Sequence, residues 1–290
     1  MEQRTIRVDG LRVRVVEASP RAERDDPVLM IHGLGGWAEN WRELMPAIAA
    51  SGRRAIAVDL PGFGASERPR RSRYFDPDEP SYARFVAAAL DTLGVPQAHI
   101  AGHSLGGAVA YTAAVTSPER VRSLTLVAPG GLGRELIREL RMLTLPGMEL
   151  LARLRRSPAV TRQVLYSCFH DPARCPEEVV AEALRYGAPA APEMVRALRS
   201  AVSFRHGIRD DVRLPWIARA PRHRGPTLVV WGIEDRVIPA SAVEEARRIT
   251  PEAEVVLIPS CGHLVMIERP GEMLDAFLPF LDRAAVAVAP

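Results

Sequence analysis

Residues 98–114 read AHIAGHSLGGAVAYTAA, and this stretch decides the fold. Its first four residues form a short apolar run typical of a buried strand, and residues 108–114 have the composition of a helix. Between them lies Gly-x-Ser-x-Gly, centred on Ser104 and followed by one more glycine. A tight strand-to-helix turn lifts a serine hydroxyl clear of the sheet, where a base can reach it. The stretch therefore predicts a serine nucleophile, with the backbone N–H of Leu105 at a helix N-terminus as a donor for an oxyanion.

Apolar strands and helical patterns alternate on both sides of this stretch. Residues 5–8 and 11–16 flank Asp9-Gly10, which favours a type I′ turn and predicts an antiparallel hairpin. Continuous apolar runs predict further strands, buried on both faces, at 28–31, 55–58, 123–128, 227–231 and 254–258. Helices are predicted over 41–50, 81–93 (N-cap Ser81, stop Gly94), 241–249 and 273–283, before a frayed tail at 284–290. This order predicts an α/β fold, a mostly parallel doubly wound sheet that binds ligands beyond the carboxyl ends of its strands.

The pattern changes between about Gly130 and Arg224, where no buried strand is predicted. Helical patterns punctuated by prolines cover 135–145, 147–155, 177–186 and 192–203. We interpret this segment as a helical insertion in the α/β core. Its apolar side chains should form mostly the core of the insertion itself, with a minority facing substrate; they include Leu136, Leu140, Met142, Leu143, Leu145, Met148 and Leu151.

Composition excludes several classes of protein. The chain has 290 residues, of which 47% are hydrophobic, as expected of a globular protein. Its 38 basic residues are all arginine and are interleaved with 35 acidic ones, so no basic stripe predicts a nucleic-acid partner. The three cysteines form neither a disulfide framework nor a metal-ligand spacing. The N-terminus lacks the apolar core of a signal peptide, and no apolar run approaches the roughly 18 residues of a membrane span. We expect a soluble, cytoplasmic protein, whose oligomeric state stays open.

A serine nucleophile needs a histidine as base and a carboxylate to orient that histidine. His263 follows the last predicted strand in a glycine-hinged loop, and Asp235 follows the strand before it. Both should therefore reach the edge of the sheet at which Ser104 lies. Two other carboxylates are weaker candidates: Glu234 should point elsewhere, and Glu268 falls just past the histidine loop.

Other polar residues near these motifs are assigned structural roles. His32 should support the glycine loop that follows it, and Asp59 should pin its own loop. Cys261 is interpreted as a small packing residue before the histidine loop, because nothing near it predicts the lowered pKa of a reactive thiol.

The contacts to substrate are the least determined part of the site. The ring of His103 should lean away from Ser104 toward packing, although the residue flanks the nucleophile. The candidate substrate contacts are Gly33, His103, Met142, Leu145, Val237 and Leu264.

Five motifs in this order resemble those of the α/β-hydrolase fold superfamily over nearly the whole chain. They are the glycine loop 32–36 (HGLGG), the loop 59–66 (DLPGFGAS), the elbow 102–107, the acid loop 232–239 (GIEDRVIP) and Gly262-His263, with Glu268-Arg269-Pro270 similar to the usual continuation. The order serine, acid, histidine is that of the superfamily. The resemblance implies a triad of Ser104, Asp235 and His263 and a second oxyanion donor in the backbone N–H of Leu34. It also implies a helical cap at residues 131–215 over the active site, inserted in a core domain of residues 1–130 and 216–290.

Serine at the elbow narrows the chemistry. Epoxide hydrolases and haloalkane dehalogenases of similar outline use an aspartate there, because they need a carboxylate to alkylate. Acyl transfer to water is left, so we expect hydrolysis of a small to medium, largely apolar carboxylic ester through an acyl-enzyme on Ser104. This chemistry needs only protein groups, the ester substrate and water, and we expect no metal and no organic cofactor.

Two alternatives stay open. The chain also resembles carbon–carbon bond hydrolases of vinylogous diketone acids from aromatic-ring breakdown, through its triad order and its Cys-Gly-His loop. Leu264 replaces the tryptophan common after that histidine, and a cap arginine, Arg205 being one candidate, would have to bind the substrate carboxylate. The second alternative is a ligand receptor that keeps the fold and the triad but signals by moving its cap.

Overall fold

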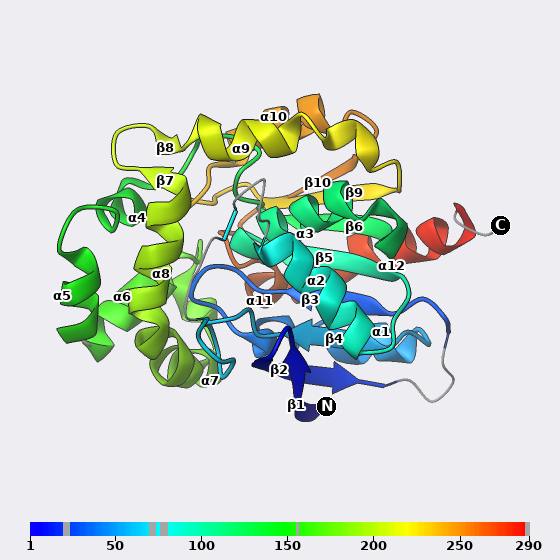
Figure 1. Ribbon diagram of the computed structural model, residues 1–290, viewed down its shortest axis with the longest axis horizontal. Coiled ribbons are helices and arrows are strands. Elements are labelled where there is room, and N and C mark those ends of the chain that lie inside the picture. The colour runs from blue at the N-terminus through cyan, green and yellow to red at the C-terminus, as the bar shows by residue number, and fades with distance from the viewer. Residues whose placement is uncertain (20–23, 70–73, 76–80, 155–156, 288–290) are drawn as a thin grey trace.

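The computed structural model describes residues 1–19, 24–69, 74–75, 81–154 and 157–287. Its centre is an eight-stranded sheet in the order β1-β2-β4-β3-β5-β6-β9-β10. Six consecutive strands of this sheet are parallel: β4 (Ala55–Val58), β3 (Val28–Ile31), β5 (Ala98–His103), β6 (Val121–Val127), β9 (Thr227–Gly232) and β10 (Glu254–Ile258). Helices lie on both faces of the sheet (Figure 1). The predicted α/β class and mostly parallel, doubly wound sheet are confirmed.

The N-terminal hairpin adds an antiparallel edge to this sheet. Strands β1 (Glu2–Val8) and β2 (Leu11–Ala18) pair antiparallel, and β2 also pairs antiparallel with β4. The turn residues Asp9 and Gly10 both have positive φ, 49° and 81°, as a type I′ turn requires. The predicted hairpin is therefore confirmed together with its turn.

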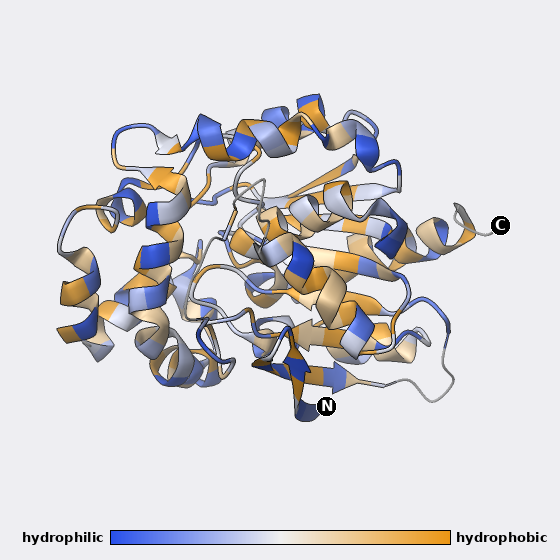
Figure 2. Cartoon of the chain, viewed as in Figure 1, coloured by the Kyte–Doolittle hydropathy of each residue, from blue (hydrophilic) through white to orange (hydrophobic). Residues whose placement is uncertain are grey.

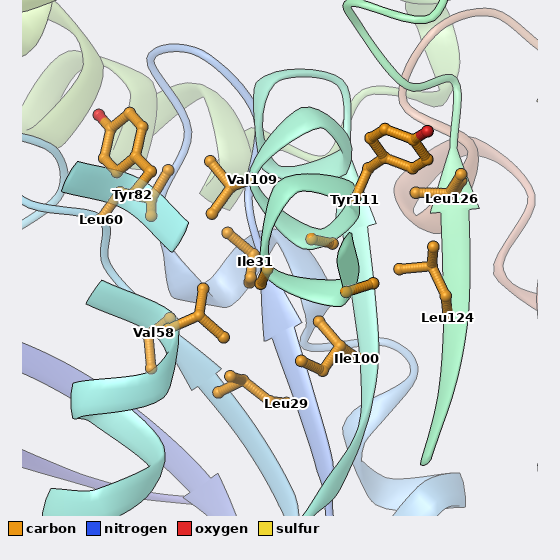
Figure 3. Close-up of a cluster of buried hydrophobic side chains, with 14 of the residues drawn as sticks. Leu29, Ile31, Val58, Leu60, Tyr82, Ile100, Val109, Tyr111, Leu124 and Leu126 are labelled. Atoms are coloured by element: carbon orange, nitrogen blue, oxygen red, sulfur yellow. The ribbon is translucent and has the colours of Figure 1, made fainter. Parts of the chain in front are cut away.

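Strand residues alternate between two hydrophobic clusters, one on each face of the sheet. In β3, Leu29 and Ile31 belong to one cluster, and Val28 and Met30 to the other. Helices α2 (Ser81–Thr92), α3 (Leu105–Thr116) and α10 (Val243–Ile249) cover the first, part of which Figure 3 shows. Helices α1 (Met45–Ala50), α11 (Val265–Glu268) and α12 (Pro270–Ala287) cover the second. Figure 2 shows hydrophobic residues in the central strands, whereas the N-terminal hairpin also carries hydrophilic ones.

Three predicted helices differ from the observed ones at their ends. The helix predicted over 41–50 begins only at Met45, because a 3-10 turn at Ala38–Trp41 precedes it. Helix α12 runs from Pro270 to Ala287, so residues 284–287 of the predicted frayed tail are helical, and 288–290 lie outside the described residues. A 3-10 turn (Ala240–Ala242) forms the start of the helix predicted over 241–249. The N-cap role predicted for Ser81 concerns a side chain outside the described set.

The segment between β6 and β9 is mostly helical, as predicted. It contains α4 (Arg138–Met142), α5 (Met148–Leu154), α6 (Pro158–Ser167), α7 (Glu177–Glu182), α8 (Ala188–Ala201) and α9 (Asp210–Ile217). Figure 1 shows α4 to α8 gathered beyond one end of the sheet. None of the described helices is both long and apolar enough to cross a membrane.

Two features of this segment differ from the prediction. A short antiparallel pair, β7 (Val202–Ser203) and β8 (Gly207–Ile208), stands where no buried strand was expected. Helices α6 and α9 were not predicted, and each contains a proline. Pro158 occupies the first turn of α6, where a backbone N–H would have no partner within the helix and its absence does not destabilise the helix. Pro215 lies inside α9.

Candidate active site

Ser104 lies on a strained turn between β5 and α3. Its φ of 52° and ψ of −114° place its backbone in a conformation that residues other than glycine rarely adopt. After this turn, the backbone of the elbow packs directly on the end of the neighbouring strand β3. A Cβ atom added at Gly106 would lie 2.3 Å from the carbonyl oxygen of Ile31 and 2.4 Å from that of His32. The glycine is therefore required by close approach of backbone to backbone.

Gly106→Ala is expected to lower the free energy of unfolding by about 3 kcal/mol, the upper part of the usual range for overpacking, because only backbone could move aside. Urea unfolding measures this change. Gly271→Ala is the matched control: its added Cβ would meet nothing within 4 Å, so the variant should be as stable as the parent or more so. Equal stability of the two variants would contradict the proposed packing.

Asp235 and His263 are brought together from the ends of the neighbouring strands β9 and β10. The imidazole Nδ1–H of His263 donates to Oδ2 of Asp235 at 2.7 Å. The other carboxylate oxygen, Oδ1, accepts the backbone N–H groups of Val237 at 2.8 Å and Ile238 at 3.0 Å. Both side chains are buried. The acid is thus held by its own loop and in turn fixes the orientation of the histidine ring.

The histidine loop is anchored by Glu268, which from the sequence was only a weaker candidate for the orienting acid. Glu268 is buried, and its carboxylate accepts the backbone N–H groups of Gly262 at 2.7 Å, His170 at 3.1 Å and Asp171 at 2.8 Å. The N–H of His263 itself donates to the carbonyl of Cys168 at 2.7 Å. These bonds join the histidine loop to the segment between α6 and α7. The position of Glu268 five residues after His263 was visible in the sequence, but its partners come from a distant part of the chain.

His103 and His32 are buried, neutral and structural. The Nε2–H of His103 donates to the carbonyl of His263 at 2.9 Å, and the two rings lie 4.6 Å apart. Burial lowers the pKa of His103 well below its usual value. In His32, Nδ1–H donates to the carbonyl of Gly33 at 2.7 Å and Nε2 accepts the N–H of Leu60 at 3.0 Å, and burial lowers its pKa as well. Both rings therefore support the loops around Ser104.

Asp59 also pins the loops near the elbow, as its sequence position predicted. Its carboxylate accepts the backbone N–H groups of Ala38 and Ala65, both at 2.7 Å, and pairs with the buried guanidinium of Arg14 at 2.7 Å. All of these partners belong to neighbouring loops and strands, so the contacts of Asp59 are those of a residue that orders the scaffold.

A cavity of about 100 Å³ lies against Ser104, and its wall is almost wholly apolar. The elbow and the glycine loop contribute Leu105 and Leu34 beside Ser104. The segment between β6 and β9 forms the opposite side, mainly with Leu136, Leu140, Ala197, Leu198, Ala201, Val202, Ile208, Val212, Arg213 and Trp216. The remaining lining residues are Phe75, Ala108, Tyr111, Thr112, Gly130, Gly131 and Ile238.

None of the six predicted substrate contacts is among these lining residues. Met142 and Leu145 are 45% and 36% exposed. Met142 lies about 200° around α4 from Leu140, which lines the cavity, so the two side chains point in nearly opposite directions. Gly33 packs on His103: a Cβ added there would lie 2.7 Å from its Nδ1. Val237 and Leu264 are buried in the hydrophobic clusters.

The predicted triad is only partly joined in this structure. His263 contacts Asp235, but the hydrogen bonds of the described residues include none between His263 and the hydroxyl of Ser104. Catalytic hydrogen bonds often become short only when substrate is bound. Leu34 and Leu105 flank Ser104 in the cavity wall, and the N–H of Leu105, first residue of α3, has no partner within its own helix.

Comparison with known proteins places this arrangement in a family. The family described as "alpha/beta hydrolase fold" matches residues 26–270. The chain belongs to the α/β-hydrolase fold family. The α/β hydrolase is 36% identical to the dihydrolipoyllysine-residue acetyltransferase component of an acetoin cleaving system from Pseudomonas putida, over 90% of the chain and 65% of that protein. The chain thus spans less than two thirds of the length of that relative.

Other relatives and solved structures match the α/β hydrolase along most of their length. A 2-hydroxymuconate semialdehyde hydrolase from Pseudomonas sp. (strain CF600) is 32% identical, over 90% of the chain and 89% of that protein. The crystal structure of a putative aryl esterase from Burkholderia cenocepacia superposes with a TM-score of 0.78 at 22% identity, covering 98% of the chain and 100% of the esterase. At that identity the likeness shows the fold alone.

The three cysteine thiols are all shifted toward the protonated form. Burial raises the pKa of the Cys168 and Cys261 thiols to about 12 and that of Cys175 to about 11, which disfavours the nucleophilic thiolate. Among the described residues, no group of three histidine, cysteine, aspartate or glutamate side chains is arranged to hold a metal ion.

Proposed function

We propose that this α/β hydrolase is a serine-dependent enzyme that cleaves a small to medium, largely apolar carboxylic ester. The observation that carries the proposal is the apolar cavity against Ser104. Arg213 is the single charged residue among its described lining residues. A hydrocarbon acyl or alcohol group would gain about 25 cal/mol for each Å² of apolar surface that it buries there.

The proposed reaction uses groups of the protein and water alone. The hydroxyl of Ser104 attacks the ester carbonyl, and Nε2 of His263 accepts its proton, while Asp235 holds the ring and stabilises the imidazolium. The backbone N–H groups of Leu34 and Leu105 bind the oxyanion. His263 then returns the proton to the leaving alcohol, and water cleaves the acyl-enzyme by the same steps.

We propose that residues 131–215 act as a cap that closes over the bound ester. Leu136, Leu140 and the α8 residues Ala197 and Leu198 line the cavity from this segment, which supports the assignment. A cap of this kind excludes water from the acyl pocket and sets the length of acyl chain that fits.

A panel of p-nitrophenyl esters with acyl chains from two to twelve carbons tests the function, with fluorophosphonate labelling to identify the reactive serine. We expect steady multiple turnover, a maximum at short or medium chains and label on Ser104. Absence of turnover with every ester, or label on another serine, would overturn the proposal. Steady turnover would also exclude a receptor that reacts only once.

Carbon–carbon bond hydrolysis is a second candidate, because the 32% identical relative is named for such a substrate. That reaction needs a cation for the substrate carboxylate. Arg205 lines a separate surface groove with Arg134 and His206, away from Ser104. Arg213 lines the cavity, but its guanidinium already donates to Asp210 at 2.8 Å and lies 3.4 Å from Glu245. Loss of the dienol absorbance of a ring-fission product on mixing would favour this candidate over the ester hydrolase.

A further inference from the structure

One face of α3 forms a continuous strip of the cavity wall. Ser104, at the start of the helix, is followed on the same face by Ala108 and Tyr111, and all three line the cavity. Residues seven apart lie within about 20° of each other around a helix, and about 10 Å apart along its axis. Between the other two, Ala108 adds only a methyl group to this strip. An acyl chain attached to Ser104 can therefore run along α3 toward Tyr111.

Tyr111 carries a polar group that the protein does not satisfy. The residue is only 4% exposed, and its hydroxyl has no hydrogen-bond partner among the described residues. Figure 3 shows its ring directed toward the end at which β6 finishes, the edge of the sheet where the elbow also lies. A buried hydroxyl without a partner costs about 1–3 kcal/mol, and such groups are rare in folded proteins. Burial also raises the pKa of Tyr111, so the phenol stays a hydrogen-bond donor.

The other polar side chains of the cavity wall already have partners. The hydroxyl of Thr112 donates to the carbonyl of Val109 at 2.9 Å, and the indole N–H of Trp216 donates to the carbonyl of Phe75 at 3.3 Å. Arg213 is held by its two carboxylates. Apart from Ser104, Tyr111 is thus the lining side chain whose hydrogen-bonding capacity is unused in the described structure.

We propose that Tyr111 is a specificity-determining residue whose hydroxyl donates a hydrogen bond to an oxygen on the acyl chain of the substrate. The inference rests on the proposed ester hydrolysis and narrows its substrate class to acyl esters that carry a second oxygen acceptor, such as a keto group, several carbons from the scissile carbonyl. A plain alkanoyl ester fills the same apolar wall but leaves the phenol unpaired. The site built in this way distinguishes the two classes by one hydrogen bond.

The test compares p-nitrophenyl octanoate with its 4-, 5-, 6- and 7-oxo derivatives. These place the keto oxygen at four distances from the scissile carbonyl, and only the distance that brings it to the Tyr111 hydroxyl should allow the hydrogen bond. In the parent protein, kcat/KM should be higher for one oxo ester, or for two with adjacent keto positions, than for the octanoate ester. Tyr111→Phe should lower this ratio about tenfold, as expected for the loss of one hydrogen bond to a buried acceptor.

Tyr82→Phe is the matched control. Tyr82 is 2% exposed and its hydroxyl also lacks a partner among the described residues, but it is not among the residues that line the cavity. This variant should leave the ratio unchanged. A ratio that neither variant alters would overturn the inference. An equal drop in both variants would overturn it as well, because the effect would then come from removing any buried phenol.

A binding measurement separates failure of this inference from failure of the proposed function. Calorimetry on Ser104→Ala and on Ser104→Ala/Tyr111→Phe with the intact esters requires no turnover. Preferential binding of one keto ester that is lost with the tyrosine hydroxyl supports the inference even when the parent protein cleaves none of them. Equal affinities for octanoate and every keto ester, or no binding of any, overturn it.

Discussion

Ser104→Ala is expected to reduce kcat for the best p-nitrophenyl ester by roughly 10⁶-fold, close to the loss of the whole triad. Removing the nucleophile of a serine hydrolase leaves only the rate enhancement that comes from binding and the oxyanion donors. Ser104 occupies a strained conformation at φ 52° that the surrounding elbow imposes, so its hydroxyl has a fixed place beside the cavity. Alanine keeps the backbone and removes only the hydroxyl oxygen.

Single-turnover and steady-state assays on the purified variant measure this loss, and Ser241→Ala, at an exposed position, provides the control. KM should change little, because the hydroxyl contributes to the transition state rather than to binding of the ester. Unfolding in urea should show Ser104→Ala at least as stable as the parent, since the mutation removes a polar group beside apolar walls. Retained activity above about 1% would show that another residue attacks the ester.

The strands and the elbow could be predicted because their sequence signals are local. Four consecutive apolar residues in β3 are fully buried, which only a strand covered on both faces allows. The turn at Asp9-Gly10 follows from residues that tolerate positive φ. The relation of Asp235 to His263 follows from topology: β9 and β10 are neighbours and parallel, so the residues just after them meet at one edge.

The wall of the cavity could not be predicted, because hydrophobicity does not say which face of a helix looks inward. Leu140 and Met142 are both apolar and two residues apart, yet the first lines the cavity and the second is 45% exposed. Trp216 lines it from α9, a helix hidden in the sequence by Pro215, although Asp210 and Asp211 in its first turn gave a start signal. Tyr111 was interpreted only as part of the helix after the elbow.

Asp235→Asn is expected to reduce kcat by about 10⁴-fold while the fold persists, because it selects the wrong tautomer of His263. In the parent, Oδ1 accepts two backbone N–H groups, from Val237 and Ile238, and Oδ2 accepts the Nδ1–H of His263. Asparagine must keep its oxygen at the Oδ1 position, where two donors point at it, so its NH₂ group faces Nδ1. Nδ1 can accept a hydrogen bond from that NH₂ group only when it is unprotonated, so the proton of the neutral imidazole then lies on Nε2. Nε2 is the nitrogen that has to accept the proton of Ser104.

Steady-state rates at pH values from 6 to 10 measure this effect, and Glu234→Gln is the matched control. Glu234 is the adjacent carboxylate, but its Oε2 accepts the N–H of Cys261 at 3.0 Å and does not contact the imidazole. The control should retain activity within about tenfold of the parent. A loss in Glu234→Gln as large as in Asp235→Asn would assign the orienting role to the loop as a whole. Activity of Asp235→Asn that recovers at alkaline pH would support the tautomer argument, because hydroxide can then take the proton that His263 no longer accepts.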